Sequence, residues 1–504
     1  MGMQRQPNVI LILVDTLRGD HLSCYGHRRL TTPRLDAFAR QARLYASAIS
    51  PGAWTPPSHA SIFTGTYPSR HGVDRMHPYL DASLTTLPEY LHELGYRTYG
   101  VSSNYWIGTA TGFDRGFDVF HHSWQLLQAH TNPALERQRR RDREYKGANT
   151  PRTLDERVRA FVNRCDTTFR HYCCQPLHAD DKGAARVNRV VRRWIREWTR
   201  MDTPVFAFIH YMEPHLPYHP PGRFRRRHLD ARLEKRARAV NQNALKFISG
   251  RIPMTAEDFD LLEHLYDAEV SYADHCIGEV LDQLRATRLL DRSVVIVTSD
   301  HGENLGDHGL MDHMFSVHEP IIRMPLLVRY PGGEHAGIED GLVQTHDLFP
   351  TIAALTPPTN GNGRHTVHTD GAVAAQFQGG PLPPLGPARD YTITELNQIQ
   401  PPIPILARRF PNFDWSLYDR PLRAIRTATD KYIRGGQGSE ELYAVIADPG
   451  ERNNLAAVRA DRTAELRARL DAWETGITPV KTGADALELD DDLRRRLEDL
   501  GYLQ

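Results

Sequence analysis

Two aspartates and a histidine in this 504-residue chain are of the types that bind a divalent cation. Asp15 follows an apolar run at residues 9–14, and Asp300 and His301 follow a second apolar run at residues 293–298. Carboxylates together with an imidazole suit Mg, Ca, Mn or Zn. Since an aspartate after a strand is often only a helix cap, neither aspartate identifies a metal site by itself.

Thr55 supplies the third element of this chemistry. It opens the segment TPPSHASIFTG, residues 55–65, in which Pro56 and Pro57 fit the first turn of a helix. Thr55 would then lie at the helix N-terminus, where free amides and the helix dipole favour an anion or an alkoxide. A threonine that served only as a cap would need no metal nearby. With a divalent cation on its oxygen, Thr55 becomes a nucleophile toward phosphorus or sulfur.

The elements that would position these residues alternate between apolar runs and helical segments. Runs at residues 9–14, 203–210, 293–298 and 325–330 predict buried strands, and residues 267–290 predict a helix. This alternation indicates an α/β fold, with a large mostly parallel sheet sandwiched by helices in a catalytic domain over residues 1–385. Because ligands bind beyond the carboxyl ends of such strands, the two aspartates and the histidine should converge on one crevice.

Further segments lie outside this core. Polar, Arg-rich stretches near residues 125–200 and 223–251 predict helical insertions over the rim of the crevice, either as a substrate lid or as solvated excursions. A Pro- and Gly-rich stretch at residues 356–390 predicts a linker. Beyond it, we expect a small C-terminal α+β subdomain with an antiparallel sheet, residues 386–480, and a helical tail, residues 481–504. The subdomain's elements are predicted as strands at 422–427, 431–434 and 441–446 and a helix at 462–475 with Leu466, Leu470 and Trp473 on its apolar face.

Charge and composition exclude several classes of partner. Lys and Arg total 62 against 62 Asp and Glu, so no net field attracts nucleic acid or an anionic membrane. No stretch approaches the roughly 20 apolar residues of a membrane helix, so no membrane segment is expected. The five cysteines are scattered and odd in number, which fits a reducing compartment and a cytoplasmic location. The oligomeric state is left open.

Six motifs, in this order, resemble those of the sulfatase family in the alkaline-phosphatase superfamily, and they extend over nearly the whole chain. They are VDTLRGD at 14–20, PSHASIFTG at 57–65, GFDRGFD at 112–118, HYMEPHLPY at 210–218, SDHGE at 299–303 with GDHG at 306–309, and ELY at 441–443 with DPGERNNL at 448–455. The resemblance implies one metal ion held by Asp15, Asp300 and His301, with the oxygen of Thr55 as a further ligand.

The resemblance also implies roles around the substrate. His215 lies at the family's histidine that contacts the transferred group or protonates the leaving oxygen. His313 falls where many sulfatases place a lysine, which suggests a cation or an acid facing the substrate. His59 occupies the place of an arginine. His59, His308 and Asn104 are expected to contact the substrate, although turn capping explains Asn104 almost as well.

The chain departs from the sulfatase pattern at its nucleophile. Sulfatases proper carry Cys or Ser at the position of Thr55 and oxidise it to formylglycine, and threonine has no route to that aldehyde. Thr16 also replaces the second aspartate of the metal pair. An unmodified threonine beside Asp, Asp and His resembles the superfamily's phosphodiesterases and its phosphoglycerol or phosphoethanolamine transferases. A sulfate ester on Thr55 would be hard to discharge without a second hydroxyl, whereas water or an acceptor alcohol can attack a phosphoryl adduct.

We therefore expect a hydrolase with one divalent metal ion (Mn, Ca or Zn) and no formylglycine. It would cleave a phosphate diester, phosphonate ester or related charged ester of a small molecule or glycan through a Thr55 adduct, with His215 or His313 protonating the leaving alcohol. The alternatives are a sulfuric ester hydrolase without formylglycine, a phosphoglycerol- or phosphoethanolamine-type transferase, and a non-catalytic protein of this fold. Specificity is expected in the Arg-rich insertions and the loop around Trp106.

Overall fold

The computed structural model describes residues 6–123, 181–357, 369–399 and 403–480. Its largest element is a nine-stranded sheet in the order β11-β2-β10-β6-β1-β5-β3-β4, with β9 paired to β2. The strands are β1 Asn8–Val14, β2 Arg43–Ile49, β3 Arg97–Ser102, β4 Val119–His122, β5 Val205–Tyr211, β6 Ser293–Ser299, β9 Arg323–Met324, β10 Leu326–Arg329 and β11 Gly337–Gln344.

The strands near the centre of the sheet run parallel. β1 pairs in parallel with β5 on one side and β6 on the other, and β3 pairs in parallel with β5 and β4. The predicted strand at 325–330 forms as β10, but it runs antiparallel to β6 and β2. The expected large, mostly parallel sheet is therefore confirmed.

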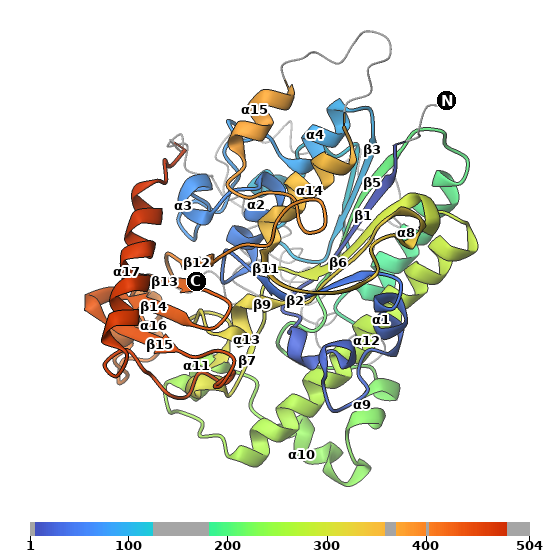
Figure 1. Ribbon diagram of the computed structural model, residues 1–504. Helices are drawn as coiled ribbons and strands as arrows, with labels where there is room; N and C mark the ends of the chain where they lie inside the picture. Colours follow the sequence, from blue (N-terminus) through green and yellow to red (C-terminus); the bar gives the residue numbers. More distant parts are fainter. Residues whose placement is uncertain (1–5, 124–180, 358–368, 400–402, 481–504) are drawn as a thin grey trace, which may run out of the picture.

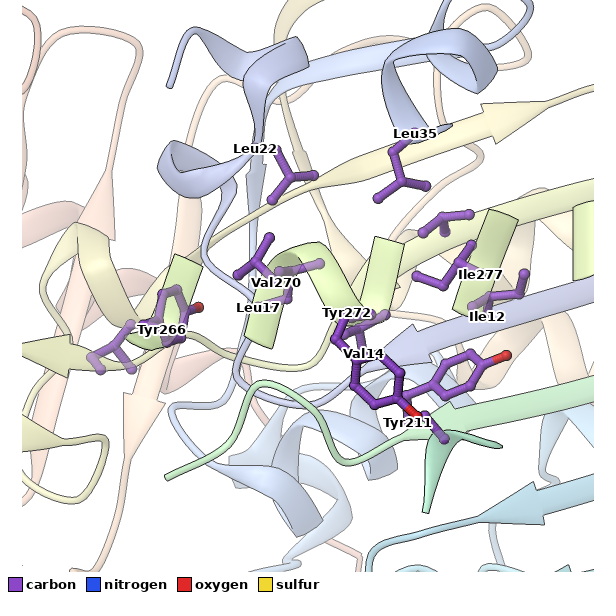
Figure 2. Packing of buried hydrophobic residues seen from close by; sticks show 14 of the residues in the cluster. Ile12, Val14, Leu17, Leu22, Leu35, Tyr211, Tyr266, Val270, Tyr272 and Ile277 are labelled. Atoms are coloured by element: carbon purple, nitrogen blue, oxygen red, sulfur yellow. The ribbon is translucent and has the colours of Figure 1, made fainter. Parts of the chain in front are cut away.

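Helices cover both faces of this sheet. All seven side chains of β1, NVILILV, are therefore buried. Ile10, Ile12 and Val14 face a layer made of α1 Pro33–Ala39, α8 Ala184–Trp198 and α12 Ala256–Ala286. Figure 2 shows Ile12 and Val14 packed beside Tyr211 of β5 and residues of α12. Val9, Leu11 and Leu13 face the opposite layer, made of α2 Thr55–Thr64, α4 Leu87–Glu93 and α14 Leu348–Leu355. Each such side chain stabilises the fold by roughly 1.5–3 kcal/mol on burial.

Helix α12 begins earlier than the sequence pattern indicates. It starts at Ala256, where Thr255 and Asp258 form a capping box that satisfies amides of the first turn. The polar residues after that box hide the beginning of the helix from a search for apolar periodicity. The early start matters because it places Tyr266 and Asp267 on α12, against the loop that follows β1.

The two Arg-rich stretches are helical where the structure describes them. Residues 181–200 contain α8, which packs on β3, β5 and α12, so this part belongs to the helical layer over the sheet. Residues 124–180, the rest of that stretch, lie outside the described residues. The second stretch contains three short helices, α9 Gly222–His228, α10 Glu234–Ala239 and α11 Ala244–Ile248. Of these, α9 and α10 contact α12.

A second, four-stranded antiparallel sheet follows near the C-terminus, as predicted. Its strands are β12 Thr392–Leu396, β13 Leu422–Arg426, β14 Lys431–Gly435 and β15 Glu440–Tyr443. Helix α17 Ala460–Thr475 covers it and buries Leu466 and Leu470 completely. The proposed boundary near residue 385 falls between β11 and β12 and stays a prediction. The tail at 481–504 lies outside the described residues.

Strand β12 connects this sheet to the start of α2. The backbone amide of Glu395 donates to the Pro51 carbonyl at 2.9 Å, and the Thr394 hydroxyl donates to the Ser50 carbonyl at 2.6 Å. In Figure 1 the small sheet and α17 lie to one side of the large sheet. Within the described ranges, no helix has both the length and the apolar character needed to cross a membrane.

Candidate active site

The ends of β1 and β6 bring Asp15 and Asp300 together. Val14 is in register with Ser299, so the residue that follows each strand lies at the same edge of the sheet. Asp15, Asp300 and His301 are all completely buried. Their ligand atoms lie within 4.8 Å of one another, as predicted from the strand order. The structure thus forms a compact cluster of two carboxylates and one imidazole.

The unpaired atoms of this cluster fit a divalent cation. Asp15 Oδ1 and Asp300 Oδ2 are buried and have no hydrogen-bond partner among the described residues. His301 Nδ1 donates to the Gly302 carbonyl at 3.0 Å, which leaves the lone pair of Nε2 pointing at the carboxylates, 3.3 Å from Asp300 Oδ2. Buried carboxylates that are left unpaired are costly, whereas a coordinated cation satisfies them.

The pKa shifts of these three residues also favour a bound divalent cation. Burial raises the pKa of Asp15, and burial together with the Asp15 carboxylate raises the pKa of Asp300 well above its ordinary value. Burial also holds the pKa of His301 well below its ordinary value, so the imidazole is neutral. Within the described ranges no Lys or Arg forms an ion pair with either aspartate, and His313 is a nearby group whose charge favours their ionised form, so a bound divalent cation would fit here.

Thr55 is the first residue of α2 and faces this cluster. Its Oγ1 lies 3.1 Å from His301 Nε2, and its exposed fraction is 4%. Pro56 and Pro57 occupy the first helical turn, as predicted. The hydroxyl therefore faces the cluster of Asp15, Asp300 and His301, which we call the metal-type cluster. A threonine that only capped the helix would point at the helix amides instead.

His59 lies one turn further along α2, beneath Thr55. Its Nδ1 donates to the Thr55 carbonyl at 2.9 Å and lies 3.5 Å from Asp300 Oδ2. Complete burial lowers its pKa to about 3, so the ring is neutral. Its Nε2 has no partner among the residues described. His59 thus supplies no positive charge at the place where the family resemblance implies an arginine.

Asn104 holds Asp15 in the structure. Its Nδ2 donates to Asp15 Oδ2 at 2.7 Å, while its Oδ1 accepts the backbone amide of Trp106 at 2.9 Å. These two bonds determine which end of the amide faces the cluster. Asn104 thereby connects the metal-type cluster to the loop around Trp106, and a contact with the substrate stays a prediction.

His313 and His215 lie beside the cluster. The ring centroid of His313 is 4.3 Å from that of His301 and 5.2 Å from that of His215. Burial alone would lower the pKa of His313, but Asp312 Oδ1 at 2.8 Å and Glu303 Oε1 at 3.1 Å outweigh burial and raise it well above its ordinary value. His313 is therefore an imidazolium held between two carboxylates.

Sequence reasoning missed Glu303 and Asp312 as partners of His313. Glu303 belongs to the motif SDHGE, but that motif gives no sign of where its side chain points. Asp312 precedes His313 in a backbone conformation with φ of 73°, which is rare for a residue other than glycine. A short hairpin of β7 Asn304–Leu305 and β8 Met311–Asp312 brings these residues together.

His308 lies apart from this group. It is exposed at the turn of the β7–β8 hairpin, and its ring stacks on His318 at 3.6 Å. His318 in turn contacts Glu441 of the C-terminal sheet at 3.2 Å. The structure does not bring His308 into the cluster of Asp15, Asp300 and His301, so the prediction of a substrate contact gains no support from its position.

Comparisons with known proteins agree with this geometry. The family model described as Sulfatase matches residues 7–358. The chain belongs to the sulfatase family.

Curated relatives include the uncharacterized sulfatase YidJ of Escherichia coli, 26% identical over 367 residues, covering 70% of this chain and 68% of the relative. The ulvan-active sulfatase of Formosa agariphila is 24% identical over 505 residues, covering 97% and 83%. Among solved structures, the phosphonate monoester hydrolase of Agrobacterium radiobacter aligns with a TM-score of 0.66 at 21% identity, covering 93% of this chain and 96% of that one. These matches make the chain a sulfatase-family hydrolase, and enzymes of this family use a divalent metal.

Thr16 lies where the sulfatase family has the second aspartate of its metal pair. Its backbone amide donates to Asp300 Oδ1 at 3.3 Å, and its carbonyl accepts from Tyr266 at 2.7 Å. Thr16 adopts a positive φ of 55°. The main chain at Thr16 therefore helps to hold Asp300, although the side chain adds no anionic ligand to the cluster of this sulfatase-family member.

A recess opens from Thr55 toward His313. Its lining comprises Trp54, Thr55, Trp106, Asp312, His313, Met314, Leu396 and Gln398. The reacting atoms of a bound ester would lie where the recess meets the metal-type cluster. No described residue of the two Arg-rich stretches is among the lining, so the specificity expected from those stretches is not found in the wall of this recess. Trp106 does line the recess, and the role of its loop in specificity stays a prediction.

Proposed function

We propose that this sulfatase-family hydrolase cleaves a phosphate diester, a phosphonate ester or a related charged ester through a covalent adduct on Thr55. The observation that carries the proposal is the position of the Thr55 hydroxyl, 3.1 Å from His301 Nε2, where His301 clusters with Asp15 and Asp300. An unmodified hydroxyl in that place has the surroundings of a nucleophile. The substrate would be an anionic ester of a small molecule or glycan.

The metal would be a single divalent ion, with Mn, Ca and Zn as candidates. Asp15, Asp300 and His301 would hold it, with the Thr55 oxygen as a further ligand. When bound, it would supply Lewis-acid stabilisation of negative charge on the ester and on the Thr55 oxygen. The donor set of two carboxylates and a neutral imidazole fits this role.

The chain's own residues would carry out the remaining steps. Thr55 Oγ1 loses its proton to solvent and attacks phosphorus, so a bond from that oxygen to phosphorus forms while the bond to the leaving alcohol breaks in line with it. His313 gives the leaving oxygen its proton, and Asp312 and Glu303 support this role because they keep the ring protonated. His215 is the alternative acid, since its Nε2 is buried without a partner among the described residues. Water then attacks phosphorus and gives a proton back to His313, while the bond from phosphorus to the Thr55 oxygen breaks and that oxygen takes a proton from solvent.

Phosphorus is preferred over sulfur because of the nucleophile. Thr55 has one hydroxyl, and this hydroxyl is consumed in the adduct, so an attack from outside must discharge it. Phosphoryl centres accept such an attack more readily than an alkyl sulfate does. The relatives named as sulfatases keep sulfate-ester hydrolysis as the competing function, and attack by an acceptor alcohol would make the enzyme a transferase. The cytoplasmic location stays a prediction from the sequence.

Parallel turnover assays test the proposal. The metal-loaded protein would be given bis-aryl phosphates, an aryl phosphonate monoester and the matching aryl sulfate, with and without EDTA. We expect phosphorus esters to turn over faster than the sulfate, EDTA to abolish turnover, and Thr55→Ala to remove it while Thr55→Ser keeps part of it. Intact-mass analysis of a reaction stopped by acid should show an adduct on wild-type protein and none on Thr55→Ala. Faster release of sulfate, or full activity in Thr55→Ala, would contradict the proposal.

A further inference from the structure

The second Arg-rich stretch, residues 223–251, does not line the recess, yet it bonds to the segment that carries His215. We infer that this stretch is a positioning element, and that Gln242 within it fixes the place of His215 beside the metal-type cluster. The inference rests on the proposed function and deepens it, because His215 serves the same reaction. Gln242 acts through the backbone that follows His215.

The orientation of the His215 ring depends on the peptide that follows it. His215 Nδ1 donates to the carbonyl of Leu216 at 2.5 Å. Nε2 is buried and has no hydrogen-bond partner among the described residues, so it is the ring atom available to a substrate. A shift of the Leu216 carbonyl would therefore turn the ring and move Nε2 away from the reacting atoms.

Two side chains from other parts of the chain hold the backbone around this peptide. Glu303 Oε2 accepts from the backbone amide of Leu216 at 3.1 Å. Gln242 holds Tyr218, two residues further on. Its Oε1 accepts from the Tyr218 amide, and its Nε2 donates to the Tyr218 carbonyl at 3.1 Å. Because Tyr218 is buried, these two bonds satisfy main-chain groups that solvent does not reach freely.

The loop that presents Gln242 is itself fixed. It joins α10 to α11, and Asn243 caps α11 by accepting a backbone amide of its first turn at 2.9 Å. The backbone amide of Asn243 donates to Asn241 Oδ1 at 3.0 Å. Val240 and Leu245, on either side of the loop, are buried in the core. Gln242 thus lies between anchors that keep it in one place.

The same stretch also supports His313. Helix α11 contacts β8, the strand that ends at Asp312 and is followed directly by His313. The ring centroids of His313 and His215 are 5.2 Å apart, with planes at 76°. Glu303 connects the two sides, because its Oε1 lies 3.1 Å from His313 Nδ1 while its Oε2 holds the backbone beside His215. The stretch therefore contacts the backbone near both histidines.

A double-mutant cycle tests whether Gln242 acts through His215. The variants of the metal-loaded full-length protein are Gln242→Met, which keeps the length of the side chain and removes its amide, His215→Ala, and their combination. Gln242→Met should lower kcat about 10–100-fold and change KM little, because misplacing a catalytic group by about 1 Å costs on that order. In the His215→Ala background the same change should cost less than about twofold. Equal losses in the two backgrounds, or no loss in Gln242→Met, would overturn the inference.

Hydrogen exchange tests the contact without turnover. In Gln242→Met the Tyr218 amide loses its acceptor, so exchange in a peptide over residues 211–219 should become about tenfold faster. Gln242→Leu also lacks both bonds and should behave alike. Gln41→Met is the matched control, because Gln41 is exposed and its side chain forms no hydrogen bond within the described ranges. The control should change neither exchange nor kcat, and unchanged exchange in both Gln242 variants would contradict the positioning role. Circular dichroism verifies folding.

The inference and the proposed function can fail separately, since the cycle can be measured on whichever ester the wild type hydrolyses. If an aryl sulfate turns over faster than every phosphorus ester but Gln242→Met has no effect in the His215→Ala background, the proposed function is wrong and the positioning role holds. If phosphorus esters turn over and the two losses multiply, only the positioning role is wrong.

Discussion

Two groups of side chains in this protein contain the same kinds of ligand atoms, yet they are suited to different tasks. The first is Asp15, Asp300 and His301 beside Thr55. The second lies where the loop after β1 meets α12 and consists of His21, His27, Glu263 and Asp267. In both groups, the possible ligand atoms lie within 4.8 Å of one another. Residue types and proximity alone would make both of them metal sites.

The difference is the charge that the chain itself supplies. In the second group, the guanidinium of Arg29 bonds to both Asp267 and Glu263. His21 Nδ1 and His27 Nε2 lie 2.7 and 3.0 Å from the oxygens of Asp267. Burial would raise the pKa of Asp267, but hydrogen bonds from the two histidines outweigh it and hold that pKa well below its ordinary value. In the first group, no Lys or Arg within the described ranges pairs with the carboxylates. We infer that unpaired buried charge, more than ligand type, indicates a metal site.

The largest effect should come from removing a carboxylate of the first group. Asp300→Asn should lose the bound metal and reduce kcat/KM by ~10³-fold or more, because single groups that stabilise transition-state charge are each worth about 10²–10³-fold and the metal supplies several such interactions. Asp267→Asn should keep both metal and activity. Metal content by plasma mass spectrometry, together with phosphodiesterase assays, checks this pair. Loss of metal in Asp267→Asn, with metal kept in Asp300→Asn, would show that the second group is the metal site and the first is not.

Removing the nucleophile should separate chemistry from metal binding. Thr55→Ala should lower kcat by ~10²–10³-fold or more while metal content stays close to that of the wild type, since three of the four proposed ligands remain. Thr55→Ser keeps a hydroxyl and serves as the control. A Thr55→Ala protein that loses both activity and metal would show that the oxygen matters chiefly as a ligand.

Removing Arg29 should sharpen the contrast further. Arg29→Met removes the guanidinium from Asp267 and Glu263. Because the side chains of Arg29 and Glu263 are 28% and 39% exposed and Asp267 keeps its histidine partners, the loss in the free energy of unfolding should be about 1.5–3 kcal/mol, the range for a hydrogen bond to a charged group. Activity on phosphorus esters should change little. Added zinc should restore part of the lost stability, because the second group would then resemble the first. Urea unfolding with and without zinc measures this, and Arg28→Met, at a neighbouring exposed arginine, is the control.

Glu213 shows a third way to accommodate a buried carboxyl group. It is completely buried, and burial followed by repulsion from Asp181 raises its pKa to about 8. A folded-state pKa above the ordinary value of 4.5 means that the folded protein holds this proton more tightly than the unfolded chain. Glu213 therefore destabilises the fold progressively as the pH rises from about 4.5 to about 8.

Glu213→Gln tests this smallest effect. Glutamine does not ionise, so the variant should gain stability relative to the wild type as the pH rises from 6 to 8. The gain should be roughly 1–3 kcal/mol, because one pKa unit corresponds to ~1.4 kcal/mol. It should level off above pH 8. Tm values of both proteins at pH 6, 8 and 9 measure it, and a difference independent of pH would show that Glu213 is ionised throughout this range.

The sequence was sufficient for the parts of the site that follow directly from strands. Asp15 and Asp300 could be brought together because β1 and β6 are recognisable apolar runs, and parallel neighbours end at one edge. Thr55 could be placed because two prolines show where α2 begins. The antiparallel direction of β10 could not be derived, since an apolar run carries no direction. Strand β12 and its contact with the loop before α2 were also missed. The pattern TITEL contains the β-branched residues typical of a strand, but nothing in it shows which loop the strand meets.

The surroundings of His313 could not be derived for a different reason. Glu303 and Asp312 reach it only because the hairpin of β7 and β8 folds back on itself, with Gly306 and Gly309 at positive φ. Leu396 reaches the recess from a part of the chain far from Thr55. Such contacts depend on loop geometry and on packing between subdomains, for which local sequence patterns contain no information.

The hydrogen bonds between β12 and the loop before α2 have a consequence for the order in which the chain folds. The residues joined by the Thr394–Ser50 hydrogen bond are 344 positions apart in the chain. During synthesis, the large sheet can assemble around β1 and β6 while β12 has not yet left the ribosome. Because β12 follows these strands in the chain, the recess that Leu396 lines can be completed only after β12 has been made. A nascent chain can thus bring Asp15, Asp300 and His301 together before the recess beside Thr55 has all of its walls.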